Sequence, residues 1–273
     1  MPEGTTIHRV ARAQTKDFAG KVVRARSPQG RFANEARRLD RRLFVRAEAY
    51  GKHLFQFWEG RRVVHVHLGM AGEFYRFEGS APPPRPTVRL RLSTPEVTVD
   101  LIGPPTCELV TEEERRAILA RLGPDPLRRD ADPLVVRTAL ERRPDRPIGD
   151  ALLDQRVIAG VGNIYRNEAL FLTGIHPLRA AGRISEDEWL AVWKTLSSLM
   201  RRGVREGTVT ADPTEPPHPP HPRVASTRAP DDDDFYVYGR TFCRRCGSRL
   251  RELTLSGRRM FACPRCQGRR SHG

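Results

Sequence analysis

The pattern of apolar and polar positions divides the chain into a first part rich in strands and a second part rich in helices. Apolar residues recur at helical spacing between residues 5 and 18, which predicts an amphipathic helix at the start. From about residue 20 to 101, short apolar runs alternate with polar residues, and glycine or proline turns separate the runs. This spacing predicts an antiparallel β-sandwich. The runs are Leu43–Val45, Leu54–Phe57, Val63–His67, Val88–Leu92 and Val97–Val99.

Helical periodicity dominates after residue 110. Thr111 with Glu114, and Ser185 with Glu188, have the spacing of capping boxes and predict helices over 111–122 and 185–203. A further helix is predicted from Asp132 to Leu140. Residues 150–155 and 163–172 are also predicted to be helical, joined by a glycine turn at 159–162. Such a turn can direct backbone N–H groups at a phosphate, although an ordinary helical hairpin with capping glycines has the same spacing.

These patterns predict an α+β multidomain protein. An N-terminal β-sandwich with its helix is expected over residues 1–105, and a helical domain over 106–206. Residues 207–234 hold a proline-rich stretch and the run Asp231 to Asp234, a composition that favours a flexible linker over a packed core. Residues 235–273 contain four of the five cysteines and form the last predicted unit.

The charge of the chain points to a polyanionic partner. Lys and Arg number 48 against 33 Asp and Glu, for a formal net charge of +15 and a pI near 10.6. Such an excess favours nucleic acid, because neutralised phosphates release counterions. A merely basic protein, or an arginine content set by genomic base composition, would give the same count. The chain has neither an apolar run long enough to span a membrane nor the profile of a signal peptide.

The cysteines have the spacing of a metal site. Cys243 and Cys246 form one C-x-x-C pair and Cys263 and Cys266 form another, which is typical of a tetrahedral zinc site made of two knuckles. Four thiolates leave no open position, so one structural Zn²⁺ is expected. Iron or disulfides could use the same residues, and an intracellular, reducing compartment disfavours the disulfides. Cys107 is interpreted as a core residue.

The first residues offer a nucleophile. Removal of Met1 would expose the secondary α-amine of Pro2 next to the carboxyl group of Glu3. An α-amine has a pKa near 8, so more of it is neutral at pH 7 than of a lysine amine, and the adjacent helix N-terminus disfavours its protonated form. A neutral amine can attack an aldehyde carbon and form an iminium. Proline is also common near the start of a helix, and that simpler reading accounts for Pro2 alone.

Taken together, these features resemble the formamidopyrimidine-DNA glycosylase and endonuclease VIII family over nearly the whole chain. The resemblance rests on four motifs in the family's order, and the opening Pro-Glu-Gly is closer to the endonuclease VIII branch. The motifs are Met1–Gly4, Gly51–His53 with His67–Gly72, Leu153–Tyr165, and the terminal cysteine pairs.

The resemblance implies a bifunctional DNA glycosylase and AP lyase of base excision repair, acting on damaged double-stranded DNA as a monomer in the cytoplasm, at the nucleoid. It implies that oxidised pyrimidines are the main substrates. The catalytic residues implied are Pro2 as nucleophile, Glu3 as general acid, Lys52 and Arg258. The DNA-binding residues implied are Asn163, Arg259 as the competitor of Arg258, and Met70 as a side chain that fills the gap left by an everted base.

Several alternatives remain at this point. Met70 could instead be a core methionine, Glu3 a helix-starting carboxylate and Lys52 a solvated surface residue. Thr5 and Thr6 stand where many relatives carry a second carboxylate, which affects the expected lesion preference. A non-catalytic zinc-finger DNA-binding protein on the same scaffold is the main rival function. A zinc-ribbon RNA-binding or ribosome-associated factor is the second, and it offers no account of Pro2.

Overall fold

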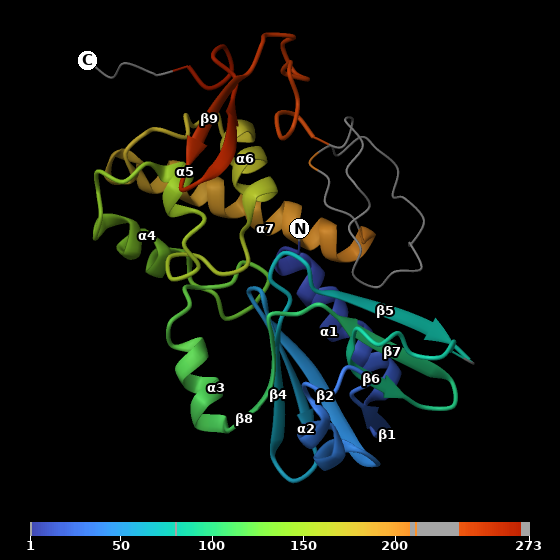
Figure 1. Ribbon diagram of the computed structural model, residues 1–273. Helices are drawn as coiled ribbons and strands as arrows, with labels where there is room; N and C mark the ends of the chain where they lie inside the picture. The colour runs from blue at the N-terminus through green and yellow to red at the C-terminus, as the bar shows by residue number, and fades with distance from the viewer. Residues whose placement is uncertain (1, 80, 208–210, 212–234, 269–273) are drawn as a thin grey trace. The chain divides into compact units, whose positions relative to one another are not determined.

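The structure is a computed structural model that describes residues 2–79, 81–207, 211 and 235–268. Its contacts divide the chain into two compact units, the first extending through Arg121 and the second beginning at Leu122 (Figure 1). The sequence patterns place the first boundary earlier, after residue 105. Strand β8 (Thr106–Val110) pairs with β4 of the sheet, so this strand and the helix that follows it, α3 (Glu112–Leu119), belong to the first unit. Most of the predicted linker, 207–234, lies outside the described residues.

The first unit is the predicted antiparallel β-sandwich with an N-terminal helix. Neighbouring strands are antiparallel, in the order β5-β7-β6-β1-β2-β3-β4-β8. Strand β1 joins the two halves, because Lys21–Val23 pair with β2 and Arg24–Arg26 pair with β6. The elements are α1 (Gly4–Phe18), β1 (Lys21–Arg26), α2 (Ala33–Leu39), β2 (Arg42–Tyr50), β3 (His53–Trp58), β4 (Arg62–His67), β5 (Glu73–Glu78), β6 (Val88–Ser93), β7 (Val97–Ile102), β8 (Thr106–Val110) and α3 (Glu112–Leu119).

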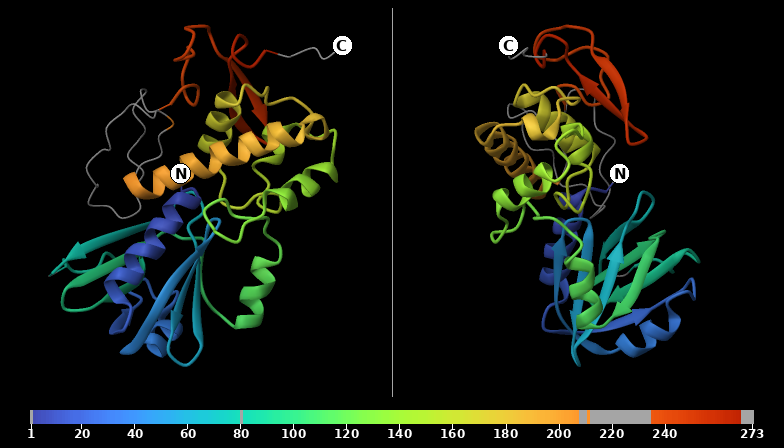
Figure 2. Two further views of the ribbon diagram at one scale, coloured as in Figure 1. Left: turned by 180° about the vertical axis from the view of Figure 1, so that it is seen from behind. Right: turned by 90° about the vertical axis from the view of Figure 1, so that its left-hand side faces the viewer.

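Helix α1 lies along the sheet in both views of Figure 2, and its direction positions the start of the chain. Its apolar face, which includes Ile7, Val10 and Phe18, is buried in the core of this unit. Near its C-terminal end, the Thr15 hydroxyl bonds to the backbone of Ala47, and the N–H of Gly20 donates to the carbonyl of Phe44. The helix therefore runs opposite to β2, and its N-terminus lies at the end of the sheet where β2 stops.

The second unit is mainly helical. Its longest helix, α7, starts with the predicted Ser185 and Glu188 capping box. It continues past Gly203, where the sequence analysis ends it, to the left-handed Gly207 with φ of 84°. Gly203 is buried within the helix, and Gly207 adopts the conformation that terminates helices. The elements are α4 (Pro133–Glu141), α5 (Ile148–Ala151), α6 (Asn163–Leu172), the 3₁₀ helix η1 (Ala181–Arg183), α7 (Glu186–Glu206), β9 (Arg251–Leu255) and β10 (Arg258–Ala262).

A two-stranded hairpin closes the described part of the second unit. Strands β9 and β10 pair antiparallel and are joined by Ser256 and Gly257, which have φ of 49° and 69°. Positive φ at both residues is what a tight hairpin turn of this length requires. No helix within the described residues has both the length and the apolar character needed to cross a membrane.

Candidate functional site

Pro2 and Glu3 lie at the N-terminal end of α1. Glu3 is the N-cap residue and is fully buried, whereas Pro2 is partly exposed. The backbone N–H of Glu3 donates to the Thr6 hydroxyl at 3.4 Å, and the N–H of Thr6 donates to the carbonyl of Glu3 at 3.0 Å. These bonds hold the first turn closed and direct the positive end of the helix dipole at this position. Pro2 therefore directly precedes a buried acidic residue and the positive end of α1.

Lys52 and Met70 occupy two loops at that same end of the sheet. Lys52 lies in the turn between β2 and β3, and Met70 lies in the loop after β4. Because His53 pairs directly with His67, both loops leave the sheet side by side. Met70 is 72% exposed, so the core-methionine alternative is wrong. Pro2, Glu3, Lys52 and Met70 are therefore grouped at one end of the first unit.

A chain of hydrogen bonds that the sequence analysis missed lies directly behind the Lys52 turn. Glu108 Oε1 is 3.0 Å from His65 Nδ1, and His65 Nε2 is 2.9 Å from His53 Nδ1. A carboxylate can only accept, so His65 carries its proton on Nδ1 and accepts the N–H of His53 through Nε2. The signal in the sequence was His65 and His67 alternating along one strand, but their partners come from two other strands.

Burial keeps these histidines neutral. Desolvation, with repulsion from His65, His67 and Arg121, lowers the pKa of His53 to about 3. The pKa of His65 is lowered as well, because burial outweighs the opposing effect of Glu108. Burial, His65 and Lys52 also lower the pKa of His67. Its Nδ1 accepts the N–H of Gly69 at 3.2 Å, so a neutral His67 carries its proton on Nε2.

In the second unit, the glycine turn between α5 and α6 is shaped by Gln155. Its side-chain amide donates to the carbonyls of Leu153 and Val161, at 3.0 and 2.9 Å, and its oxygen accepts the N–H of Gly160 at 2.9 Å. Gly160 has φ of 87°, which favours glycine. These bonds lead the chain into α6, whose first residue is Asn163.

Two asparagines of α6 bind the free edge of β10. Asn163 Nδ2 donates to the carbonyl of Arg259 at 3.1 Å, and Asn167 Oδ1 accepts the N–H of Phe261 at 2.7 Å. Residues four apart on a helix are separated by about 6 Å, which matches two residues along a strand. The hairpin is therefore fixed to α6 through its own backbone. Asn167 was not identified from the sequence.

The two arginines at the start of β10 lie on opposite faces of the strand. Arg258 is on the face of the strand that carries Met260, which is buried in the main core of this unit. Arg259 is exposed on the other face, where its Nε lies 3.9 Å from Glu252 and its guanidinium lies 5.7 Å from the centre of the Phe261 ring. Asn163, Arg258 and Arg259 are thus brought together where α6 meets the hairpin.

Glu168 anchors the segment that leads into the cysteine pairs. Its carboxylate accepts the backbone N–H groups of Tyr236, Val237 and Tyr238 at 2.9, 3.0 and 2.8 Å. It is buried, and burial raises its pKa against the effect of these three donors. Glu168 is the one acidic residue of α6, but its partners lie far along the chain, so the sequence does not reveal the anchor.

Cys243, Cys246, Cys263 and Cys266 have the geometry of a zinc-finger site. Their sulfur atoms all lie within 4.8 Å of one another. The Sγ atoms of Cys246 and Cys263 are 3.4 Å apart, and those of Cys243 and Cys266 are 4.0 Å apart. Four sulfurs at about 2.3 Å from one tetrahedral ion would be about 3.8 Å from each other, so the cluster fits Zn²⁺.

Comparison with known families and proteins agrees with this arrangement. Residues 1–115 match the formamidopyrimidine-DNA glycosylase N-terminal domain, and residues 122–213 match the formamidopyrimidine-DNA glycosylase H2TH domain. Endonuclease 8 1 of Mycobacterium tuberculosis is 45% identical over 98% of this chain and 100% of its own length. Probable endonuclease 8 2 of Streptomyces coelicolor is 33% identical over 98% of this chain and 94% of its own length.

Solved structures share the fold. A complex between the Lactococcus lactis Fpg and an abasic site containing DNA has a TM-score of 0.79, with 22% identity over 97% of this chain and 99% of that chain. A complex between the LlFpg protein, a THF-DNA and an inhibitor has a TM-score of 0.80, with 22% identity over 98% of this chain and 100% of that chain. The chain therefore belongs to the formamidopyrimidine-DNA glycosylase and endonuclease 8 family, in its endonuclease 8 branch.

Proposed function

We propose that the chain removes oxidised bases, chiefly pyrimidines, from duplex DNA through a Schiff base on Pro2 and then cleaves the strand at the abasic sugar. Membership of the family makes the chain a DNA glycosylase with lyase activity in base excision repair. The observation that carries the mechanism is the fully buried Glu3 at the N-cap of α1, directly after Pro2. This position joins a nucleophile, a proton donor and a helix N-terminus.

The chemistry begins at the Pro2 nitrogen. After Met1 is removed, this neutral secondary amine attacks C1′ of the damaged nucleotide, and the bond from C1′ to the base breaks with its electrons on the base, which takes a proton from water. Glu3 manages the protons at the sugar as a general acid, and the positive end of α1 disfavours the protonated amine that could not attack. The C1′–O4′ bond then breaks, O4′ takes a proton from Glu3, and the Pro2 nitrogen gives its proton to the Glu3 carboxylate, which leaves an iminium between Pro2 and C1′.

The iminium then acts as an electron sink for strand cleavage. It makes the C2′ proton acidic, and loss of that proton breaks the bond between C3′ and the 3′ phosphate oxygen. A second elimination breaks the bond to the 5′ phosphate, and hydrolysis releases Pro2. Lys52 is expected to contact phosphate and to assist these proton transfers. Its turn lies at the same end of the sheet as Pro2.

The remaining predicted residues bind the DNA. We assign Arg258 to the phosphate beside the lesion, as the family resemblance implies, with Arg259 on the opposite face of β10 as its competitor. Asn163 contacts the backbone from the start of α6. Met70, which is exposed in a tight loop, fills the gap left by the everted base, and this offsets part of the cost of unstacking.

We assign one structural Zn²⁺ to the cysteine cluster. When bound, it would hold the hairpin base closed, and no reaction step uses it because four thiolates leave no open position. Cys246→Ser is expected to abolish stoichiometric zinc and to weaken DNA binding strongly, whereas Cys107→Ser, outside the cluster, should change neither. Metal content is measured by atomic absorption and DNA affinity by fluorescence anisotropy. Full zinc and unchanged affinity in Cys246→Ser would contradict this ligand assignment.

The mechanism is tested by borohydride trapping on duplex DNA with a single abasic site. A covalent protein–DNA adduct is expected for the processed protein, and it should be lost in Pro2→Gly and in protein with an N-terminal extension. A C-terminal extension of equal length is the matched control and should preserve the adduct. Fully active protein that retains Met1, as seen by mass spectrometry, would rule out the Pro2 nucleophile.

The preference for oxidised pyrimidines is tested on a panel of defined lesions. Thymine glycol and dihydrouracil are expected to be excised faster than 8-oxoguanine, in duplex and in single-stranded oligonucleotides. Thr5 and Thr6, which replace a second acid of many relatives, are buried beside Glu3. Faster excision of 8-oxoguanine would show that the branch resemblance does not predict the substrate.

A further inference from the structure

One side of α4 forms a groove that the proposed reaction does not use. Residues along this helix at the spacing of successive turns share one face and line the groove, while Val136 is buried in the core. One half of the groove is cationic and the other is apolar. The α4 residues that line it are Val135, Thr138, Ala139, Leu140 and, at the C-cap, Arg142.

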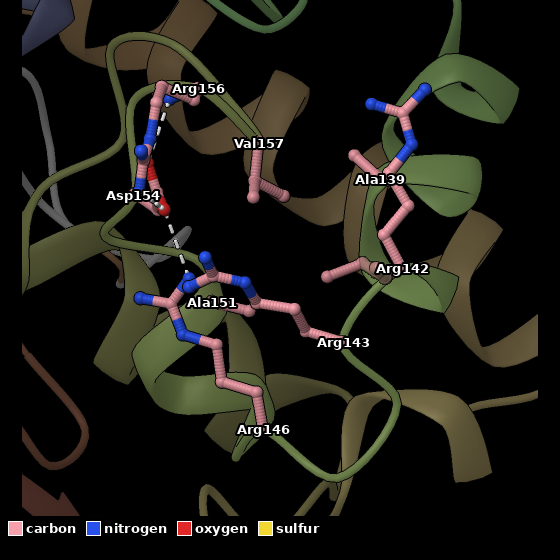
Figure 3. A pocket seen from close by; sticks show the side chains of 9 residues that line it. Ala139, Arg142, Arg143, Arg146, Ala151, Asp154, Arg156 and Val157 are labelled. Carbon is pink, nitrogen blue, oxygen red and sulfur yellow. Dashed lines mark hydrogen bonds and ion pairs between the residues drawn. The ribbon is translucent and has the colours of Figure 1, made fainter.

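The cationic half is a pocket of about 140 Å³ (Figure 3). Four arginines and one acid, Asp154, belong to its lining. Asp154 already binds Arg146 at 3.0 Å and Arg156 at 2.9 Å, and these contacts hold its pKa well below its usual range. The arginines are Arg142, Arg143, Arg146 and Arg156.

The two arginines from the end of α4 lack an acidic partner. Within the part of the chain that the structure describes, no ion pair is formed by Arg142 or Arg143. Figure 3 shows both side chains at the edge of the pocket, and that of Arg143 extends toward Arg146. The pocket therefore has two guanidinium groups available for a carboxylate or a phosphate, Arg143 beside the Asp154 network and Arg142 on the side of α4.

The apolar half, of about 240 Å³, adjoins the first along a shared wall. Leu122, Pro124 and Val135 belong to this half, and Ala139, Arg142, Arg156 and Val157 line both. Val135 is 53% exposed although it is a β-branched apolar residue on a helix. A ligand that fills both halves therefore needs a large apolar side chain for the apolar half and a negatively charged group beside it for the cationic half.

We propose that this groove binds an acidic peptide segment of a partner protein, with an apolar side chain against Val135 and carboxylates on Arg142 and Arg143. Charge complementarity selects the acids, and the apolar half selects a peptide over a nucleic acid backbone. A DNA phosphate would use the arginines and would gain nothing from Val135. A helix groove with a few anchors is a common mode of peptide recognition.

The probe is a fluorescein-labelled peptide, acetyl-Asp-Asp-Asp-Glu-Leu-Phe, titrated with the full chain by anisotropy. A dissociation constant on the order of 10–100 μM is expected at low salt, in the range of transient peptide contacts. A twin peptide with Asn and Gln in place of the acids, and a twin with Gly-Gly in place of Leu-Phe, should each bind at least about fivefold more weakly.

Matched variants localise the binding. Val135→Asn and Arg142→Ala are each expected to weaken the acidic peptide by at least about fivefold. Leu134→Asn changes an equally exposed apolar residue on the same helix that does not line the groove, and Arg183→Ala removes an exposed arginine of η1. Both controls should bind the peptide like the unmodified chain. Thermal unfolding of each variant verifies that it is folded.

A second titration uses an undamaged duplex of DNA. The proposal predicts that Val135→Asn leaves DNA affinity unchanged. It is overturned if no variant and no twin peptide changes the peptide affinity, or if the unmodified chain fails to bind the acidic peptide. It is also overturned if Arg142→Ala weakens DNA binding while peptide binding does not depend on Val135, because the pocket would then be a phosphate site.

Discussion

At the scale of single residues, Glu3 combines two properties that rarely occur together. It is a carboxyl group that is fully buried, and it is the N-cap of the first helix. A helix N-terminus alone would favour an exposed acid at this position. Glu3 also forms a capping box with Thr6, so the helix cap and the proposed general acid use the same side chain, and only an experiment separates the two roles.

Glu3→Gln tests this role because glutamine keeps the shape and removes the proton chemistry. Excision of a damaged base is expected to slow by about 100-fold or more, the usual contribution of a general acid. Cleavage at a preformed abasic site should fall much less, since the base has already left. Single-turnover rates on DNA with a damaged base and on DNA with a preformed abasic site measure the two effects separately. Glu113→Gln on α3 is the control, and an unaltered excision rate in Glu3→Gln would reduce Glu3 to a helix-starting residue.

His53 is expected to make the stability of the folded protein depend on pH in the acid range. Its pKa is about 3 in the folded chain and near 6.5 when unfolded, so between these values the unfolded chain binds a proton that the folded chain does not. Stability from this group is therefore complete above pH 6.5 and falls as the pH drops toward 3, by at most roughly 1.4 kcal/mol per pH unit.

His53→Gln keeps an N–H donor for His65 and does not titrate. We expect its stability to decline less steeply than that of the unmodified chain between pH 6.5 and pH 4, with the difference largest at the acid end. Urea unfolding at a series of pH values measures this, with pH 8 as the reference where the histidine is neutral in both states. Parallel curves would show that His53 does not contribute to acid sensitivity.

At the scale of elements, the hairpin β9–β10 depends on α6 for its free edge. Without Asn163 and Asn167, the carbonyl of Arg259 and the N–H of Phe261 would lack their partners from α6. The position of Arg258 therefore depends on helix side chains that lie nearly a hundred residues away in sequence. This connection explains how a short hairpin can hold Arg258, which we propose to bind phosphate, in place.

Asn167→Ala is expected to destabilise the chain by roughly 1–3 kcal/mol, the usual cost of leaving a buried N–H without an acceptor. The same change should weaken binding to abasic DNA, because β10 loses one of its two bonds to α6. Thr195→Ala is the control, since that exposed threonine bonds only within its own helix. Chemical denaturation and anisotropy measure the two effects, and equal behaviour of the two variants would contradict the coupling.

The elements found from the sequence are those with local signals. Capping boxes marked α3 and α7, and alternating apolar runs marked β3, β4, β6 and β7. Strands β1, β5 and β8 were not identified. The charged residues of β1 interrupt its alternation, and β8 is only partly buried. Long-range pairing holds these strands, so a local pattern does not reveal them.

The same distinction applies to the site. The cysteine cluster and the Pro2–Glu3 start could be read from spacing, because each lies within a short motif. Asn167, Glu168 and the chain Glu108–His65–His53 could not, because every partner is on another element. That Arg258 and Arg259 lie on opposite faces also follows only from the pairing of β10, and which of them binds phosphate stays a prediction.

At the scale of the whole molecule, the net charge of +15 attracts the protein to DNA over a long range. Many arginines are already used within the fold, as in the pairs Arg76–Asp17 and Arg91–Asp100. Those pairs cannot also neutralise phosphate without breaking. The net charge therefore sets long-range attraction, while a smaller number of arginines makes the contacts that release counterions.

Salt titration counts those contacts. The logarithm of the binding constant for a duplex with an abasic-site analogue should fall linearly with the logarithm of salt, with a slope of about 0.9 per phosphate contacted. Arg258→Ala is expected to weaken binding and to lower the magnitude of the slope by about 1. Arg201→Ala, an exposed arginine on α7, removes the same charge and should leave the slope unchanged. If both variants change the slope equally, Arg258 contributes only to the general field of the protein and does not grip a particular phosphate.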